Sequence, residues 1–246
     1  MKSLLAIDIG NTSIRFGVFN RGRVSCAWSV STRQKSYYAA VKKALRRYSI
    51  ERVVICSVVP AALRQLRADL KIIPGTPEVL IIGKQIKAPL KNRYRYPRQV
   101  GQDRLVNAFA GVIFYGKPLI VVDSGTAITL DVVSRKGEYL GGVILPGLEL
   151  SFDSLYNKTA LLPRLKLRAP RELIGRDTKE SILSGVIHGF AAAIDELVSR
   201  IKKEIGRDAA VVATGGGALL LRRYCKNISK VDKDLTLKGI SLLERL

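Results

Sequence analysis

Blocks of apolar and polar positions along the chain predict two similar sets of strands. Short apolar segments bounded by turn residues, at 4–9 and 119–124, are typical of strands in the core of a sheet. Each segment runs into a turn with the pattern Asp-x-Gly and then into a second apolar strand. Later buried strands at 53–57 and 211–215 also resemble each other. We interpret the chain as an internal duplication with a boundary near residues 116–118.

Helical signals separate these strands. Pro60 suits the first position of a helix, because its missing N–H has no partner there. Asp177 with Glu180 three residues later resembles a capping box, and a stripe predicted to pack in the core follows it. The stripe consists of Ile182, Val186, Phe190, Ile194, Leu197, Ile201 and Ile205. The pattern predicts an α/β fold of two lobes, 1–116 and 117–246, each a mixed sheet flanked by helices, with the ligand site in a cleft between them.

The overall composition is that of an ordinary globular protein. Apolar residues make up 47% of the 246 positions, which is enough for a packed core. Asp8 ends the first apolar run too early for a signal peptide, and no later stretch is expected to span a membrane. Cys26, Cys56 and Cys225 are too widely spaced to suggest a disulfide framework or a zinc site. We therefore expect a cytoplasmic protein.

Positive charge is the unusual global property, with 42 Lys and Arg against 20 Asp and Glu, a net charge of +22. The cations between Lys84 and Arg98 alternate with Tyr94 and Tyr96, which would suit a nucleic-acid surface. No known nucleic-acid motif accompanies them. A positive field also attracts small anionic substrates, and we favour that interpretation.

The first Asp-x-Gly turn has the groups that a phosphate-binding loop needs. Gly10 permits a tight turn, and Asn11, Thr12 and Ser13 offer an amide, hydroxyls and backbone N–H groups to phosphate oxygens. Asp8, at the end of the strand, can hold Mg²⁺ directly or through water. One such turn is weak support, because an ordinary hairpin has the same pattern, but its recurrence in the second half favours a nucleotide site.

The second turn, Gly125-Thr126, repeats these groups with Asp123 at its mouth. Glycines 215–217 follow a buried strand and would allow the backbone to approach a flat ligand such as adenine, although they also suit a plain helix-entry turn. No Walker sequence is present, which disfavours P-loop chemistry.

The order of the short motifs resembles that of the type III pantothenate kinases over nearly the whole chain. The matching landmarks are Asp8-Ile9-Gly10-Asn11-Thr12, Gly101-Gln102-Asp103-Arg104, Asp123-Ser124-Gly125-Thr126, Leu140-Gly141-Gly142 with Pro146-Gly147, Leu162-Pro163, Gly175-x-x-Thr178 before Ser184-Gly185, and the closing Leu235-Thr236-Leu237-Lys238-Gly239. Each is unspecific alone, whereas their order and spacing together are specific.

The resemblance implies two actin-like, ribonuclease H-like lobes with an ATP cleft between them. It also implies ATP-dependent phosphorylation of pantothenate to 4′-phosphopantothenate, the first step of coenzyme A synthesis. The expected cofactors are Mg²⁺ and a monovalent cation, K⁺ or NH₄⁺, and the expected assembly is a homodimer formed by elements of the second lobe.

Site residues follow from the resemblance at matching positions. The ATP-binding set is Asp8, Ile9, Gly10, Asn11, Thr12, Ser13, Ile14, Arg15 and Thr126, acting largely through the backbone. The pantothenate-binding set is Tyr94, Gly101, Gln102, Asp103, Arg104 and Thr178. Asp103 is similar to the family's general base, and Asp123 is similar to its monovalent-cation ligand.

Asp103 and Arg104 also make chemical sense by themselves. Phosphoryl transfer to an alcohol needs a carboxylate that accepts the hydroxyl proton, and Asp103 can supply it. Arg104 offers a planar fork that can bind a carboxylate, which pantothenate has. Without the family pattern, an exposed Asp–Arg pair opening a helix over 105–115 would be the simpler interpretation.

A few positions depart from the family or lie outside its chemistry. Ser124 stands where a bulky residue is common, and Ile128 and Leu130 replace residues that are often hydroxylated or aromatic. These changes concern packing. His188 is the only histidine and is expected to be a packed or interface residue, because a lone histidine completes neither a triad nor a metal site.

Two alternative functions stay open at this point. One is a catalytically idle relative that acts as a regulatory or nucleic-acid-binding protein. The other is an actin-like kinase for a different small acid or sugar. Retention of Asp8, Asp103 and Asp123 favours an active kinase, and Tyr94 with the Arg104 region would set its substrate.

Overall fold

The computed structural model describes residues 3–245, which form two compact units. Within them, the first unit contains 3–90, 96–110 and 235–245, and the second contains 91–95 and 111–234. This division differs from the expected lobes in three places. The C-terminal helix packs in the first unit, whereas the short segment 91–95 and residues 111–116 pack in the second. Residues 1, 2 and 246 of the expected lobes lie outside the described residues.

The first unit is built on a five-stranded sheet in the order β3-β2-β1-β4-β5. Its strands are β1 (Ser3–Ile9), β2 (Ser13–Asn20), β3 (Arg23–Ser31), β4 (Ile50–Ser57) and β5 (Glu78–Ile81). The first three form an antiparallel meander, and β4 and β5 run parallel to β1. The central strands are fully buried over most of their length, as expected for a sheet covered on both faces.

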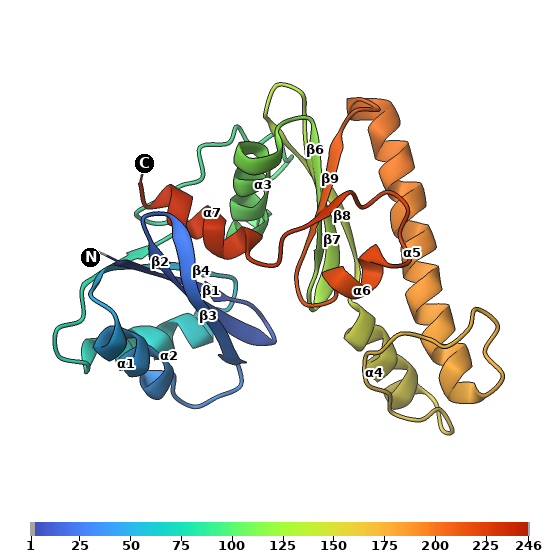
Figure 1. The fold of residues 1–246 in the computed structure, drawn as a ribbon, viewed down its shortest axis with the longest axis horizontal. Helices are drawn as coiled ribbons and strands as arrows, with labels where there is room; N and C mark the ends of the chain where they lie inside the picture. The colour runs from blue at the N-terminus through green and yellow to red at the C-terminus, as the bar shows by residue number, and fades with distance from the viewer. Residues whose placement is uncertain (1–2, 246) are drawn as a thin grey trace. The chain divides into compact units, whose positions relative to one another are not determined.

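Helices cover both faces of this sheet (Figure 1). They are α1 (Tyr38–Arg47) and α2 (Pro60–Lys71) on one face, and α7 (Leu235–Leu243) with the first part of α3 (Gln102–Tyr115) on the other, preceded by the short helix η1 (Pro97–Gln99). Pro60 is the first residue of α2, as predicted. Gly239 lets α7 approach α3 closely, because a Cβ there would lie 2.6 Å from Val106.

The second unit repeats the topology of the first. Its sheet has the order β10-β9-β6-β7-β8. The strands are β6 (Leu119–Ser124), β7 (Ala127–Val133), β8 (Tyr139–Pro146), β9 (Ala210–Thr214) and β10 (Lys230–Val231). Again the first three are antiparallel, and the last two run parallel to the first. Both sheets therefore have the same order and directions when read from the meander outward, which confirms the predicted duplication.

The helices α4 (Leu148–Lys158), α5 (Thr178–Ile205) and α6 (Ala218–Arg222) pack on one face of the second sheet (Figure 1). The predicted stripe on α5 is only partly right. Val186 and Ile194 are buried, whereas the other five residues of the stripe are half-buried at the margin of the core. The deepest positions include Leu183, Ile187 and Val198, because the predicted spacing is slightly longer than the helical repeat and drifts off the buried face.

The start of α5 confirms one half of the predicted capping box. The Asp177 side chain accepts a hydrogen bond from the Glu180 N–H at 2.9 Å. The Glu180 carboxylate binds the Arg168 guanidinium at 2.6 Å and the Arg171 N–H at 3.0 Å, and so it holds the preceding loop against the helix. These bonds lower the pKa of Glu180 below its ordinary value, and the bond from the Arg171 N–H has the largest effect.

Helix α5 also has the length and apolar composition of a membrane-spanning helix, which the sequence pattern did not lead us to expect. Its apolar face packs on the sheet of the second unit, with Leu183 and Ile187 fully buried. The core helix of a globular domain has the same composition, so this feature is weak support for a membrane segment.

Candidate active site

The first predicted phosphate loop consists of the four residues 10–13 between the last paired residues of β1 and β2. Ile9 and Ile14 are the last paired residues, and the Gly10 N–H donates to the Ser13 carbonyl at 3.0 Å. Thr32, just after β3, braces the loop twice, because its hydroxyl donates to the Gly10 carbonyl at 2.7 Å and its N–H to the Thr12 carbonyl at 3.1 Å. Nothing in the local sequence marks Thr32 for this role.

The residues of this loop divide into core and surface positions. Ile9 and Ile14 are fully buried in the hydrophobic core beneath the sheet, so they can meet a ligand only through their backbone. Asn11 and Thr12 are exposed at the tip. Arg15 is half-buried and lies opposite Asp8 in the β1–β2 register.

Asp8 and Asp103 lie close to the same buried thiol. Asp8 of β1 and Cys56 of β4 are register partners at the carboxyl end of the two parallel strands. Burial raises the pKa of the Cys56 thiol well above its usual value, and the charges of Asp8 and Asp103 raise it further. The fold therefore brings two carboxylates that are distant in the sequence close to one buried thiol.

Asp103 lies in the first turn of α3, where its Oδ1 accepts the Arg104 N–H at 2.8 Å. Gly101 leaves space for this carboxylate, because a Cβ at that position would lie 2.5 Å from the same oxygen. Burial raises the pKa of Asp103 above its ordinary value, although the bond from the Arg104 N–H and the Arg104 charge oppose the rise. A partly desolvated carboxylate with a raised pKa is a better proton acceptor than one in water.

The second phosphate loop joins β6 to β7 and is one residue shorter than the first. Ser124 and Ile128 are the last paired residues, and the Gly125 N–H donates to the Ala127 carbonyl at 3.0 Å. Thr126 is exposed at its tip. The shorter connection leaves fewer backbone groups for a ligand than the loop of the first unit.

Glycines outside the loop allow close packing around it. The Gly147 N–H donates to the Thr126 carbonyl at 3.1 Å, and a Cβ on Gly147 would overlap that oxygen. Gly215 has φ +87°, and a Cβ there would lie 2.5 Å from the Asp123 Oδ1. The Gly217 N–H donates to the Ser124 carbonyl at 3.0 Å. These glycines therefore support the loop itself, a role that the sequence did not predict for them.

The small side chain of Ser124 suits this packing. It is 3% exposed and lies against Gly217, so a bulkier residue would have to displace the backbone there. Gly216 differs from its neighbours, because a Cβ at that position would meet no atom within 4 Å.

Two separate carboxylates, rather than a cluster, are the candidates for cation binding. No group of three or more His, Cys, Asp or Glu side chains within residues 3–245 is arranged to hold a metal ion. Asp8 and Asp123 are each half-buried at the end of a central strand, beside a phosphate loop. A single carboxylate suits a hard cation that takes its other ligands from phosphate, carbonyl oxygens and water.

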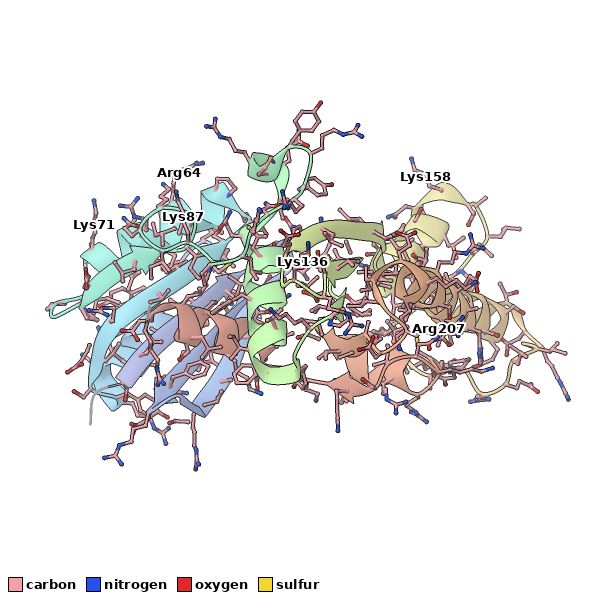
Figure 2. The ribbon with its side chains drawn as sticks, turned by 90° about the horizontal axis from the view of Figure 1, so that it is seen from above. Arg64, Lys71, Lys87, Lys136, Lys158 and Arg207 are labelled. Carbon is pink, nitrogen blue, oxygen red and sulfur yellow. The ribbon has the colours of Figure 1, made fainter. Side chains whose placement is uncertain are left out.

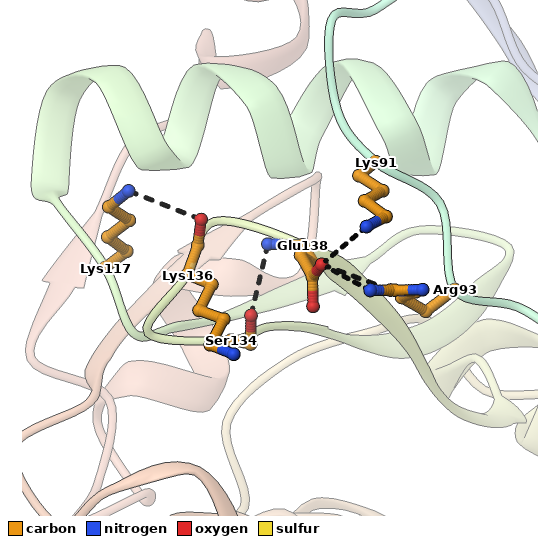
Figure 3. A network of polar contacts seen from close by, with 6 residues as sticks. All are labelled: Lys91, Arg93, Lys117, Ser134, Lys136 and Glu138. Carbon is orange, nitrogen blue, oxygen red and sulfur yellow. Dashed lines mark hydrogen bonds and ion pairs between the residues drawn. The ribbon is translucent and has the colours of Figure 1, made fainter.

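Tyr94 belongs to the second unit. The segment 91–95 runs along β8, where the Arg93 N–H donates to the Tyr139 carbonyl at 2.8 Å. Figure 3 shows how Glu138 holds this segment, through Lys91 at 3.4 Å and Arg93 at 2.8 Å. The Tyr94 ring covers Gly141, whose missing side chain leaves space for it.

The other predicted substrate residues are divided between the units. Residues 101–104 lie in the first unit, and Thr178 is the exposed first residue of α5 in the second. His188 packs edge-on against the Tyr224 ring, with ring centroids 4.9 Å apart. This contact agrees with the packed role expected for His188.

Basic side chains project from many separate elements. In Figure 2, Arg64 and Lys71 extend from α2, Lys136 from the turn between β7 and β8, and Lys158 from the end of α4. Charges distributed in this way are solvated separately, which is the usual condition of surface lysines and arginines.

Solved structures with the same fold include kinases. One is a putative 2-dehydro-3-deoxygalactonokinase from Sinorhizobium meliloti, with a TM-score of 0.60 and 16% identity. The match covers 98% of both chains. It is also similar to a putative Baf family transcriptional activator from Campylobacter jejuni, with a TM-score of 0.56, 18% identity and coverage of 98% and 96%. These likenesses concern the fold, and they agree with the predicted actin-like lobes.

Sequence comparison is more specific. Residues 4–200 match the family model of type III pantothenate kinase. The chain is 41% identical to the type III pantothenate kinase of Moorella thermoacetica, over 98% of both chains. It is also 41% identical to that of Rubrobacter xylanophilus, over 99% of this chain and 97% of the relative. The chain belongs to the type III pantothenate kinase family.

Proposed function

We propose that this chain transfers the γ-phosphoryl group of ATP to the terminal hydroxyl of pantothenate. The product would be 4′-phosphopantothenate, which begins coenzyme A synthesis. One observation carries the proposal beyond family membership. The fold brings the charges of Asp8 and Asp103 close to the same buried Cys56 thiol, and burial raises the pKa of Asp103.

In the proposed reaction, Asp103 accepts the proton of the attacking hydroxyl as the new O–P bond forms. The bond between the γ-phosphorus and the bridging oxygen breaks, and ADP leaves with that oxygen. Phosphoryl transfer of this kind depends on positioning and charge neutralisation more than on covalent catalysis. The Arg104 N–H bond keeps the Asp103 carboxylate oriented without neutralising it.

The two loops would hold the ATP phosphates. In the first, exposed Asn11 and Thr12 present side chains and backbone, while Ile9 and Ile14 contribute backbone alone. In the second, Thr126 would complete the grip. The bracing of the first loop by Thr32 supports this assignment, because a preorganised loop does not have to be ordered when phosphate binds.

Cations would act at the carboxylates of Asp8 and Asp123. Asp8 would hold Mg²⁺, directly or through water, and Asp123 would bind K⁺ or NH₄⁺. When bound, these ions would neutralise phosphate charge.

Pantothenate would be recognised by residues 101–104, with Tyr94 and Thr178. The Arg104 guanidinium suits the substrate carboxylate, because its planar fork can donate two parallel hydrogen bonds. The clamp of Glu138 on Arg93 supports a positioning role for Tyr94, since it holds the neighbouring backbone on β8.

A homodimer in the cytoplasm is the assembly that we propose. Large apolar side chains of the second unit are exposed, such as Ile144 at 60% and Leu150 at 49%. Gly185 and Gly189 lie on the exposed side of α5, where an added Cβ would meet no atom within 4 Å, so another helix could approach closely. Exposed apolar surface of this kind is typical of a protein interface.

The decisive measurement is ADP production with pantothenate, Mg²⁺ and K⁺, compared with other small acids and sugars. We expect turnover with pantothenate only, and its loss in Asp103→Asn. Turnover with a different acid or sugar alone would identify another kinase. Absence of turnover together with salt-sensitive nucleic-acid binding would instead favour the idle relative.

A further inference from the structure

The first unit has a polar cavity at the end of its sheet where β1 and β4 begin, and the first phosphate loop lies at the other end of β1. Its volume is about 270 Å³. Its walls come from the start of β1, the turn between β2 and β3, the start of β4 and the end of α7. A strand as long as β1 spans roughly 20 Å, so this cavity is well separated from Asp8 and the loop that follows it.

Three arginines line the cavity, and they differ in their ion pairs. Arg52 is held by Glu244 at 2.6 Å and by Glu78 at 3.1 Å, so its charge is already neutralised and its position is set. Arg21 and Arg245 form no ion pair within residues 3–245, and both are exposed. Two guanidinium groups therefore remain available to an anion.

Arg21 occupies a backbone conformation that disfavours arginine. Its φ is +49°, the only positive value among the non-glycine residues that the structure describes, and Gly22 follows with φ +80°. Positive φ at both central residues defines a hairpin turn that normally takes Asn, Asp or Gly. An arginine here costs stability that asparagine would not, and such outliers often mark functional positions.

Arg245 has a defined place over the same turn. Its Nη2 and Nη1 lie 2.8 and 2.9 Å from the position that a Cβ on Gly22 would take, so the glycine makes space for the guanidinium. Helix α7, which ends two residues before Arg245, is anchored, because the buried Thr236 hydroxyl donates to the Asn107 Oδ1 at 2.7 Å. The cavity therefore has an organised wall before any ligand arrives.

We propose that this cavity binds a small phosphorylated anion, and that it is separate from the nucleotide site. Guanidinium forks match phosphate oxygens in pairs, and two of them can grip one phosphate or pyrophosphate group. Glu244 opposes binding less than an unpaired carboxylate would, since it is paired with Arg52, which it shares with Glu78. Glu51, which also lines the cavity, is exposed to water, where its charge is screened.

The test is a titration of the full-length chain with pyrophosphate, followed by amide NMR signals. We expect saturable shifts at Gly22 and Arg245 that are independent of any shifts at Gly10 in the nucleotide loop. A dicarboxylate such as succinate should bind more weakly. Shifts confined to Gly10, or succinate binding as tight as that of pyrophosphate, would overturn the proposal.

Variants make the test specific. Arg21→Asn removes a guanidinium and suits the turn, so the chain should fold at least as well and bind pyrophosphate about tenfold more weakly. Arg245→Gln should weaken binding similarly. Arg23→Gln is the matched control, because Arg23 lies in the same hairpin but does not line the cavity. Equal weakening by Arg23→Gln, or unchanged affinity in Arg21→Asn, would contradict the assignment.

Discussion

Asp123 and Thr214 are register partners on the parallel strands β6 and β9, and they repeat the relation of Asp8 to Cys56 on β1 and β4. In both sheets the aspartate is the penultimate residue of the central strand, and a small buried side chain lies beside it. The duplication therefore extends from topology to the positions of individual carboxylates.

Substitution of Asp103 should separate catalysis from stability. We expect Asp103→Asn to lower kcat by about 10²–10⁴-fold, since the proton acceptor is lost. Because the folded chain raises the pKa of Asp103, ionisation opposes folding as pH rises past the ordinary carboxyl range. The variant should therefore gain stability relative to the parent near neutral pH but not at pH 3. Thermal unfolding at both pH values would show this.

Asp69 provides a control in which the same substitution should lower stability rather than raise it. It is 4% exposed and accepts hydrogen bonds from the Tyr37 N–H at 2.6 Å and the Gln65 amide at 3.0 Å. Asp69→Asn makes the same chemical change and should cost about 1–3 kcal/mol of unfolding free energy. If both variants lose stability at neutral pH, the burial argument for Asp103 is wrong.

Gly147 should be essential to the second phosphate loop for a steric reason. Its backbone is extended and suits any residue, but a Cβ would overlap the Thr126 and Gly125 carbonyl oxygens. We expect Gly147→Ala to cost about 1–3 kcal/mol of unfolding free energy and to raise the KM for ATP. Gly216→Ala, with open space around it, should stay within about 0.5 kcal/mol of the parent. Equal effects of the two changes would refute the packing argument.

Thr214 and Thr236 are buried threonines, and we expect their substitution by valine to change stability in opposite directions. The Thr214 hydroxyl has no hydrogen-bond partner in the part of the chain that the structure describes, whereas the Thr236 hydroxyl donates to Asn107. We expect Thr214→Val to be neutral or to stabilise by up to about 1 kcal/mol, and Thr236→Val to destabilise by about 1–2 kcal/mol. Denaturant unfolding measures both. A loss of stability in Thr214→Val would mean that its hydroxyl is satisfied in solution.

The clamp on the Tyr94 segment should weaken in acid. The hydrogen bond from Arg93, together with the charges of Arg93 and Lys91, lowers the pKa of Glu138. The stability that ionised Glu138 gives to this segment is fully present above the ordinary glutamate pKa and is lost as pH falls through the lowered pKa. Hydrogen-exchange protection of the Arg93 and Tyr139 amides should fall over that range, and Glu138→Gln should lower it at neutral pH.

Glu196 provides the comparison for this clamp. It pairs with Arg200 at 2.7 Å on α5, and its pKa is also lowered, chiefly by the hydrogen bond to Arg200. Glu196→Gln should leave the protection of the Arg93 amide unchanged. A similar loss in both variants would show that a general charge effect, rather than the local clamp, holds the segment.

Much of the architecture was predictable because its signals are local. Apolar runs and Asp-x-Gly turns identified the central strands of both sheets, and Pro60 and Asp177 identified the starts of two helices. These signals depend on side-chain periodicity and on backbone preferences within a few residues. The same local motifs, taken in order, also identified the family.

The sequence alone determined the duplicated strands, the two loops and the residue types that phosphoryl transfer needs. Only the tertiary structure decided that α7 joins the first sheet, that segment 91–95 joins the second, and that Thr32 and Gly147 support the two loops. The reason is physical. Such contacts join residues far apart in the chain, and whether they form depends on how the packed elements meet rather than on any local preference.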